Sequence, residues 1–242
     1  MNQVFIYAFI ASFALILGAI LGVCFKFRQK VIASFMAFGS GVLICALTFG
    51  LMEEAFNHGG FDAVIIGFLS GGLMFIIGNY VLYYFGGRTH KTKQTHKTHK
   101  NTNGKLIILG SVLDGIPESI ALGVALFNTG TSGLLMLVAI FLSNFPESIS
   151  SITGLKREEF SNIKIITLWL IVAIISFLSV VLSYLFLNNI DPNIMGIIES
   201  FAAGAILAML ADSMMPEAYE EGGFRIGILT ILGFLIAFII SR

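Results

Sequence analysis

Two apolar stretches of this chain carry acidic residues in their interior, each beside a proline. Residues 114–119 read DGIPES and residues 143–148 read SNFPES, so Pro-Glu-Ser recurs at an offset of 29 residues. An ionised side chain at the centre of a bilayer costs on the order of 2.5–3.5 kcal/mol. Acids in such positions therefore predict a function, and carboxylates there would bind cations or protons.

The spacing of these acids places them on common helix faces. Asp114 and Glu118 are four residues apart, as are Ser143 and Glu147, and residues four apart share one face of a helix. No Lys or Arg falls in the interior of an apolar stretch, so protons or a bound cation must balance the negative charge. The alternative is that the prolines only kink the helices and that the acids are protonated and bonded to nearby serines. Asp212 lies in a later apolar stretch. It could likewise be a protonated structural residue, or it could be a proton acceptor or a peripheral metal ligand.

The composition is that of an integral membrane protein. Hydrophobic residues make up 57% of the 242 residues, charged residues only 12%, and the mean hydropathy is +0.93. A soluble domain carries about 25% charged residues. Cys24 and Cys45 lie inside apolar stretches, where we expect them to be small buried side chains and not a disulfide framework.

The apolar stretches and the basic residues together predict eight transmembrane helices with both termini outside. The expected spans are 4–25, 31–55, 62–85, 105–127, 131–153, 163–187, 194–219 and 223–241. With this topology, every one of the 14 Lys and Arg residues except Arg242 falls in a loop on the cytoplasmic side. The first stretch lacks a basic segment before it and is expected to be a retained span. The fold class is all-α, and residues 1–242 form a single transmembrane domain.

An internal repeat relates the second and third spans to the seventh and eighth. At an offset of 163 residues, Glu54-Ala55 matches Glu217-Ala218, and the Gly-Gly-Phe at 59–61 matches the one at 222–224. Five spans separate the second from the seventh, so the two cross the bilayer in opposite directions. We therefore predict a 3+2+3 inverted repeat, an arrangement that is typical of secondary transporters.

The segment 86–104 is the only long polar one, and we predict a basic, histidine-containing, disordered cytoplasmic loop. It contains repeated Thr, His and Lys and hardly any apolar residue. One interpretation is that it fixes the topology and contacts anionic lipids. The other is that His90, His96 and His99 bind metal loosely.

The two Pro-Glu-Ser motifs resemble those of the fourth and fifth spans of ZIP (Zrt/Irt-like) metal transporters. Members of that family have eight spans, a histidine-bearing loop between spans 3 and 4, and 3+2+3 inverted symmetry. Their span 4 pattern is His-Asn-x-Pro-Glu-Gly, and their span 5 pattern is His or Gln, Asn or Asp, x, Pro, Glu, Gly. This chain departs from both, because Asp114 and Ser143 stand where the histidine or glutamine is expected.

The resemblance implies a metal site formed by Asp114, Glu118, Asn144 and Glu147, with Ser143 adjacent and Asp212 as a further accessory residue. Span 6 has no acid or histidine, so a single metal position is favoured over two. An all-oxygen site favours harder ions such as Mn²⁺ or Mg²⁺, whereas family membership favours zinc, with Fe²⁺, Mn²⁺ or Cd²⁺ as further cargo.

We therefore predict a secondary transporter that carries divalent cations, zinc first, into the cytoplasm. It would be a multi-pass protein of a bacterial plasma (inner) membrane, with no cofactor beyond the transiently bound cation. Its expected partners are divalent metal ions and the lipid bilayer, with a homodimer left open and no nucleic acid.

Three rival hypotheses remain open. One is a proton-coupled transporter of another small solute, and another is a metal sensor that does not transport. The third is an intramembrane hydrolase with Asp114 and Asp212 as a dyad, which lacks a Gly-x-Gly-Asp or His-Glu-x-x-His context. Under the favoured hypothesis, the protein is not an enzyme and has no catalytic residues.

Overall fold

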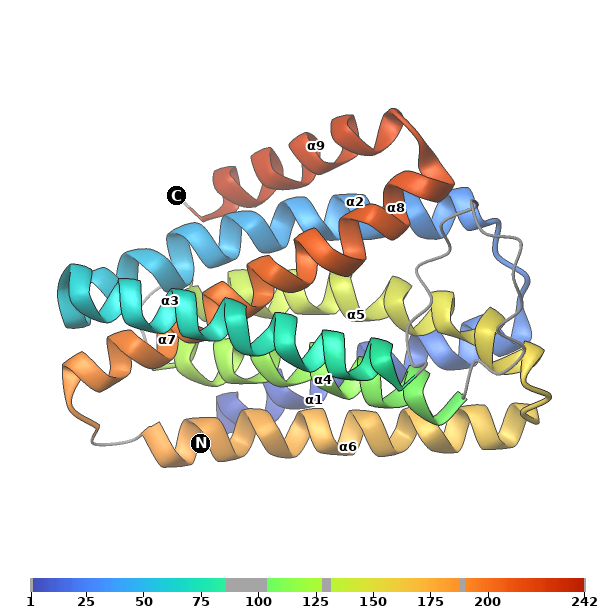
Figure 1. The fold of residues 1–242 in the computed structure, drawn as a ribbon, viewed down its shortest axis with the longest axis horizontal. Coiled ribbons are helices and arrows are strands. Elements are labelled where there is room, and N and C mark those ends of the chain that lie inside the picture. Colours follow the sequence, from blue (N-terminus) through green and yellow to red (C-terminus); the bar gives the residue numbers. More distant parts are fainter. Residues whose placement is uncertain (1, 86–103, 128–131, 188–189, 242) are drawn as a thin grey trace.

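The computed structural model describes residues 2–85, 104–127, 132–187 and 190–241, and this part of the chain is helical throughout (Figure 1). The first half contains α1 (Asn2–Cys24), α2 (Gln29–Ala46), the π-helix η1 (Leu47–Met52), α3 (Glu53–Tyr84) and α4 (Gly104–Ala125). The second half contains α5 (Ser132–Arg157), α6 (Asn162–Leu187), α7 (Pro192–Met209), the π-helix η2 (Leu210–Met214), α8 (Met215–Gly222) and α9 (Arg225–Ile240). The all-α prediction is confirmed. The predicted loop 86–104 lies, apart from its last residue, outside the described residues.

Six helical stretches in the described residues are long and apolar enough to cross a membrane. One of them, Gln29–Tyr84, has 56 residues and contains a sharp break at Gly60, where φ is 65° and ψ is −165°. α9 is apolar but has only 16 residues. The chain is thus a multi-pass membrane protein, while eight spans and the side on which the termini lie stay predictions.

The two halves of the internal repeat share unusual local geometry. The π-helices begin at Leu47 and Leu210, which are 163 residues apart, the offset at which the sequence repeats. Gly60 and Gly223 are related by the same offset and have the same φ of 65°. π-helical turns are rare and occur frequently at functional sites. Their recurrence indicates that the sequence match reflects a repeated structural unit.

Glycines allow the repeated helices to pack with their backbones in close approach. A Cβ atom on Gly71 of α3 would lie 2.0 Å from the carbonyl oxygen of Phe201 of α7. A Cβ on Gly41 of α2 would lie 2.0 Å from the carbonyl oxygen of Thr230 of α9. Without a hydrophobic driving force between helices in lipid, such close packing is a main source of helix association.

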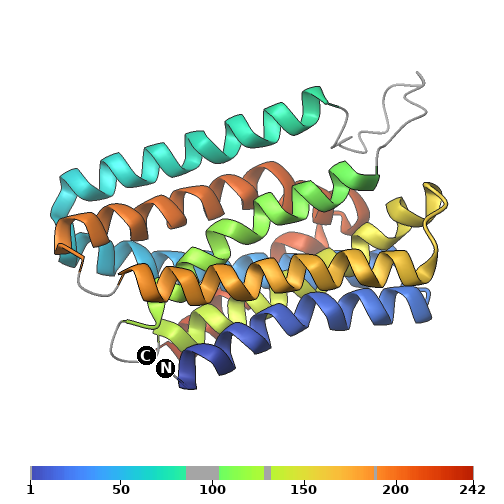
Figure 2. The same cartoon turned by 90° about the horizontal axis from the view of Figure 1, so that it is seen from below.

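The helix ends fall at two ends of an elongated bundle, and both chain termini lie at the same end (Figures 1 and 2). The turns α1–α2, α5–α6 and α8–α9 lie at the opposite end (Figure 1). These three turns and the residues beside them carry the exposed basic side chains Lys26, Arg28, Lys30, Lys156, Arg157, Lys164 and Arg225. The described basic residues are therefore clustered at one end of the bundle, as the topology prediction requires.

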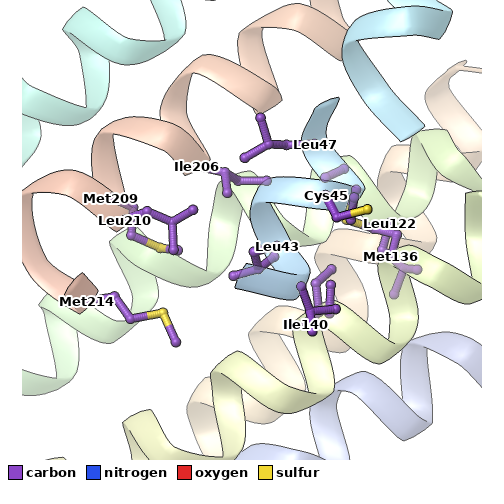
Figure 3. Packing of buried hydrophobic residues seen from close by; sticks show 14 of the residues in the cluster. Leu43, Cys45, Leu47, Leu122, Met136, Ile140, Ile206, Met209, Leu210 and Met214 are labelled. Atoms are coloured by element: carbon purple, nitrogen blue, oxygen red, sulfur yellow. The ribbon is translucent and has the colours of Figure 1, made fainter. Parts of the chain in front are cut away.

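The core lies where α2, α4, α5 and α7 meet (Figure 3). Leu43, Leu122, Ile140 and Ile206 are each at most 2% exposed there. Cys45 belongs to the same cluster, which confirms its predicted burial, whereas Cys24 is exposed at the end of α1. The prediction for Cys24 was therefore wrong, because the last residue of α1 is not covered by another helix.

Candidate metal site between the two proline-containing helices

Both Pro-Glu-Ser motifs lie inside helices that continue through their prolines. Pro117 is in the interior of α4 and Pro146 in that of α5. A proline cannot donate to the carbonyl one turn earlier, so Pro146 leaves the carbonyl oxygen of Leu142 without that helical bond. This oxygen faces α2, where a Cβ on Gly39 would lie only 2.8 Å from it. The freed carbonyl thus lies against a helix backbone.

Glu118 is the most deeply buried acid of the two motifs. Its side chain on α4 is 1% exposed, and that of Ser143 on α5 is 2% exposed. The Ser143 hydroxyl donates to Oε1 of Glu118 over 2.8 Å, which joins the two motifs directly. Oε2 of Glu118 has no hydrogen-bond partner among the described residues. One oxygen of this carboxylate is held in place, and the other is available to a ligand.

Asp114 lies one helical turn before Glu118 and is 4% exposed, so two buried acids share one face of α4. Asn144, 2% exposed, follows Ser143 on α5. It borders a small pocket of about 10 Å³, the space of roughly one water molecule, on the neighbouring face of α4, where Gly115 and Ser111 lie. The remaining lining side chains are Leu15, Val112, Ile116, Val172, Ile175, Ser176 and Ser179. The pocket beside Asn144 is therefore lined by neutral polar and apolar residues.

The other two candidate residues, Glu147 and Asp212, are less buried than this pair. Glu147 is half-buried, one turn beyond Ser143 on α5. Asp212 lies in η2 and accepts a hydrogen bond from the Asn79 side chain of α3. In the part of the chain that the structure describes, no three His, Cys, Asp or Glu side chains gather closely enough to hold a metal ion. The structure brings Glu118 and Ser143 together and does not cluster all the candidate acids.

A further buried acid lies at the end of the bundle away from the basic turns. Glu199 of α7 is 0% exposed, and its Oε2 lies 2.8 Å from Nδ1 of His58 on α3. Neither Glu199 nor His58 belongs to the motifs from which the candidate site was predicted. These two residues are 141 apart, and no motif links them, so the sequence contains no signal that could have paired them.

Comparison with known proteins decides the family. A family model described as "ZIP Zinc transporter" matches residues 86–241, which is more than half of the chain. The chain belongs to the ZIP family. The predicted resemblance to the ZIP family is thereby confirmed.

Curated relatives are similar over nearly the whole length. The protein named "Zinc transporter ZupT" of Enterobacter sp. (strain 638) is 28% identical over 244 residues, covering 91% of this chain and 88% of the relative. The ZupT proteins of Salmonella newport and Salmonella typhimurium are 27% identical with the same coverage. With 91% of the chain covered, the likeness extends into residues 1–85, which lie outside the range matched by the family model.

Proposed function

We propose that this ZIP family member is a secondary transporter that carries divalent metal cations across the membrane into the cytoplasm. The name of its ZupT relatives makes zinc the first expected cargo, with Fe²⁺, Mn²⁺ and Cd²⁺ as further ions. The observation that carries the proposal is the 1% exposed Glu118 inside an apolar bundle, held by Ser143 through one oxygen only. A carboxylate in such a place needs a cationic partner, and a transported cation supplies one.

The proposed ion site consists of Asp114, Glu118, Asn144 and Glu147, with Ser143 and Asp212 as accessory residues. Glu118 and Asp114 would bind the ion first, because both are buried on one face of α4. Asn144 and a water molecule from the adjoining small pocket would add to the shell. Glu147 would join when α4 and α5 move relative to each other, which is consistent with the absence of a three-acid cluster among the described residues. A water-completed shell suits a transporter, since the ion must also leave.

The proposed architecture has eight spans, a 3+2+3 inverted repeat and both termini outside. Two observations support it: the chain breaks at Gly60 and Gly223 related by 163 residues, and the basic side chains gathered at the end opposite the termini. The clustering of basic residues supports a cytoplasmic position for that end. Alternating access would move α4 and α5 against the repeated helices α2–α3 and α7–α9.

Uptake into proteoliposomes tests this function. The purified chain is assayed with Zn²⁺, Mn²⁺, Fe²⁺, Cd²⁺ and Mg²⁺, beside the variants Glu118→Ala and Glu147→Ala. Asp62→Ala removes an exposed acid on α3 and serves as the matched control. We expect uptake of at least zinc by the parent chain and the control, and its loss in both motif variants. Absence of uptake of every ion, or undiminished uptake in both variants, would contradict the proposal; zinc binding without uptake would indicate a metal sensor.

A further inference from the structure

Ser143 occupies the position at which the ZIP motif has a histidine or glutamine, and its hydroxyl is already engaged. It donates to Oε1 of Glu118 over 2.8 Å, and the carbonyl oxygen of Ile140 in its own helix lies 3.0 Å from it. A serine hydroxyl carries one hydrogen, so it donates to only one of these oxygens at a time. The bond to Glu118 crosses from α5 to α4 and links two side chains that are almost completely buried.

The geometry gives the two oxygens of Glu118 different roles. Oε1 is fixed by Ser143, while Oε2 is buried and has no hydrogen-bond partner among the described residues. A carboxylate held at one oxygen presents the other to an ion in a defined direction. Carboxylates that bind metals are in general hydrogen-bonded by outer partners, whose removal typically costs 10–100-fold in affinity.

We propose that Ser143 is a positioning residue that orients the Glu118 carboxylate for the transported ion and is not itself a ligand. This inference rests on the proposed function and deepens it. The histidine or glutamine of the family motif is long enough to contact an ion directly, whereas the side chain of Ser143 is short. At this position we therefore infer that Ser143 orients the Glu118 carboxylate instead of binding the ion. The ion is then bound at this point through Oε2 of Glu118, and the shell consists of oxygen atoms.

The first test compares variants at position 143 that differ in the hydroxyl alone. Thr and Val have the same shape, so Ser143→Thr keeps the donor and Ser143→Val lacks it. Zinc uptake into proteoliposomes gives KM and the maximal rate. We expect Ser143→Val and Ser143→Ala to raise KM about 10–100-fold with a maximal rate within about twofold, and Ser143→Thr to retain the parent KM. Ser40→Ala is the control, because Ser40 is equally buried and bonds only to its own helix, at the Met36 carbonyl oxygen.

The second test separates positioning from direct ligation by a double-mutant cycle. Glu118→Asp keeps the charge but shortens the side chain, so its carboxylate no longer reaches Ser143. If Ser143 acts through Glu118, adding Ser143→Ala to Glu118→Asp raises KM less than about threefold further. If the two effects multiply in full, Ser143 acts independently of Glu118 and the inference is overturned. An unchanged KM in Ser143→Val overturns it as well.

The outcome also distinguishes this inference from the proposed function. If the parent chain moves no ion, the proposed function fails. If the parent chain transports zinc and all hydroxyl-deleting variants keep its KM, only the positioning role fails. If Ser143→Ala does not accumulate as a folded protein, the Thr and Val pair gives the same comparison with the side-chain volume maintained.

Discussion

Gly60 and Gly223, 163 residues apart, have almost the same backbone conformation, with φ of 65° at both and ψ of −165° and −150°. This region of φ and ψ is accessible essentially to glycine alone. Each glycine also follows a π-helix, η1 in the first half and η2 in the second. The two chain reversals are therefore built in the same way, and each fixes the position at which one long helix gives way to the next.

Substitution of either glycine by alanine should destabilise the fold. A Cβ atom on Gly60 or Gly223 would meet no other atom within 4 Å, so the loss comes from the backbone and not from crowding. A non-glycine residue in such a conformation costs about 1–3 kcal/mol. We expect Gly60→Ala and Gly223→Ala to lower the thermal unfolding midpoint in detergent. Gly227→Ala, at an exposed position in the first turn of α9, is the control and should leave the midpoint unchanged or raise it. Equal midpoints for all three variants would contradict this account.

The neighbouring glycines Gly71 and Gly72 of α3 should respond very differently to alanine. A Cβ on Gly71 would lie 2.0 Å from the Phe201 carbonyl oxygen, whereas a Cβ on Gly72 would lie 3.5 Å from the nearest atom, the Gly204 carbonyl oxygen. Gly71→Ala must therefore separate α3 from α7, at a cost of about 1–3 kcal/mol typical of overpacking. Gly72→Ala makes an ordinary contact and serves as its matched control. Unfolding of both variants in detergent measures the difference, and equal stability would show that α3 and α7 do not pack in this register.

Sequence patterns predicted the features of the fold that depend on local composition. The apolar runs, the placement of basic residues and the Gly-Gly-Phe repeat were sufficient for an all-helical membrane protein with breaks near Gly60 and Gly223. The π-helices were not predicted, because the hydrogen-bond shift that produces them leaves no mark in the hydrophobic period. The number of eight spans, which rests on the apolar stretches and the basic residues, stays a prediction.

The candidate site was predicted in its residues but not in its pairings. Glu118 and Ser143 were predicted from the two Pro-Glu-Ser motifs. The free-energy cost of an ionised side chain in the bilayer was the reason to assign Glu118 a function. Ser143 donates to Glu118, while Asn144 borders a pocket on the adjacent face of α4. Both contacts depend on how α4 is rotated relative to α5. Sequence spacing places residues on the face of one helix and contains no information on how two helices are turned toward each other.

The contact between His58 and Glu199 should stabilise the end of the bundle near Gly60. Glu199 is 0% exposed, and removal of a partner from a buried acid is destabilising because the charge is then less well compensated. We expect His58→Ala to lower the free energy of unfolding by about 1–3 kcal/mol. The same change made together with Glu199→Gln should cost less than His58→Ala alone, because the amide is neutral. Denaturation in detergent gives the free energy of unfolding of the two single variants and the double variant. A double variant less stable than both single variants would contradict a stabilising contact between His58 and Glu199.

Labelling of single cysteines tests the proposed orientation of the chain in the membrane. Asp62 lies just beyond the break at Gly60, and Lys164 lies at the start of α6, at the opposite end of the bundle (Figure 1); both side chains are exposed. In a background with Cys24→Ser and Cys45→Ser, we introduce Asp62→Cys or Lys164→Cys. A membrane-impermeant maleimide added to intact cells should label Asp62→Cys and leave Lys164→Cys unmodified until the cells are lysed, because basic ends stay in the cytoplasm. The reverse pattern would invert the topology. Labelling of both positions in intact cells would place the two ends of the bundle on one side of the membrane, which a helix spanning the bilayer between them does not allow.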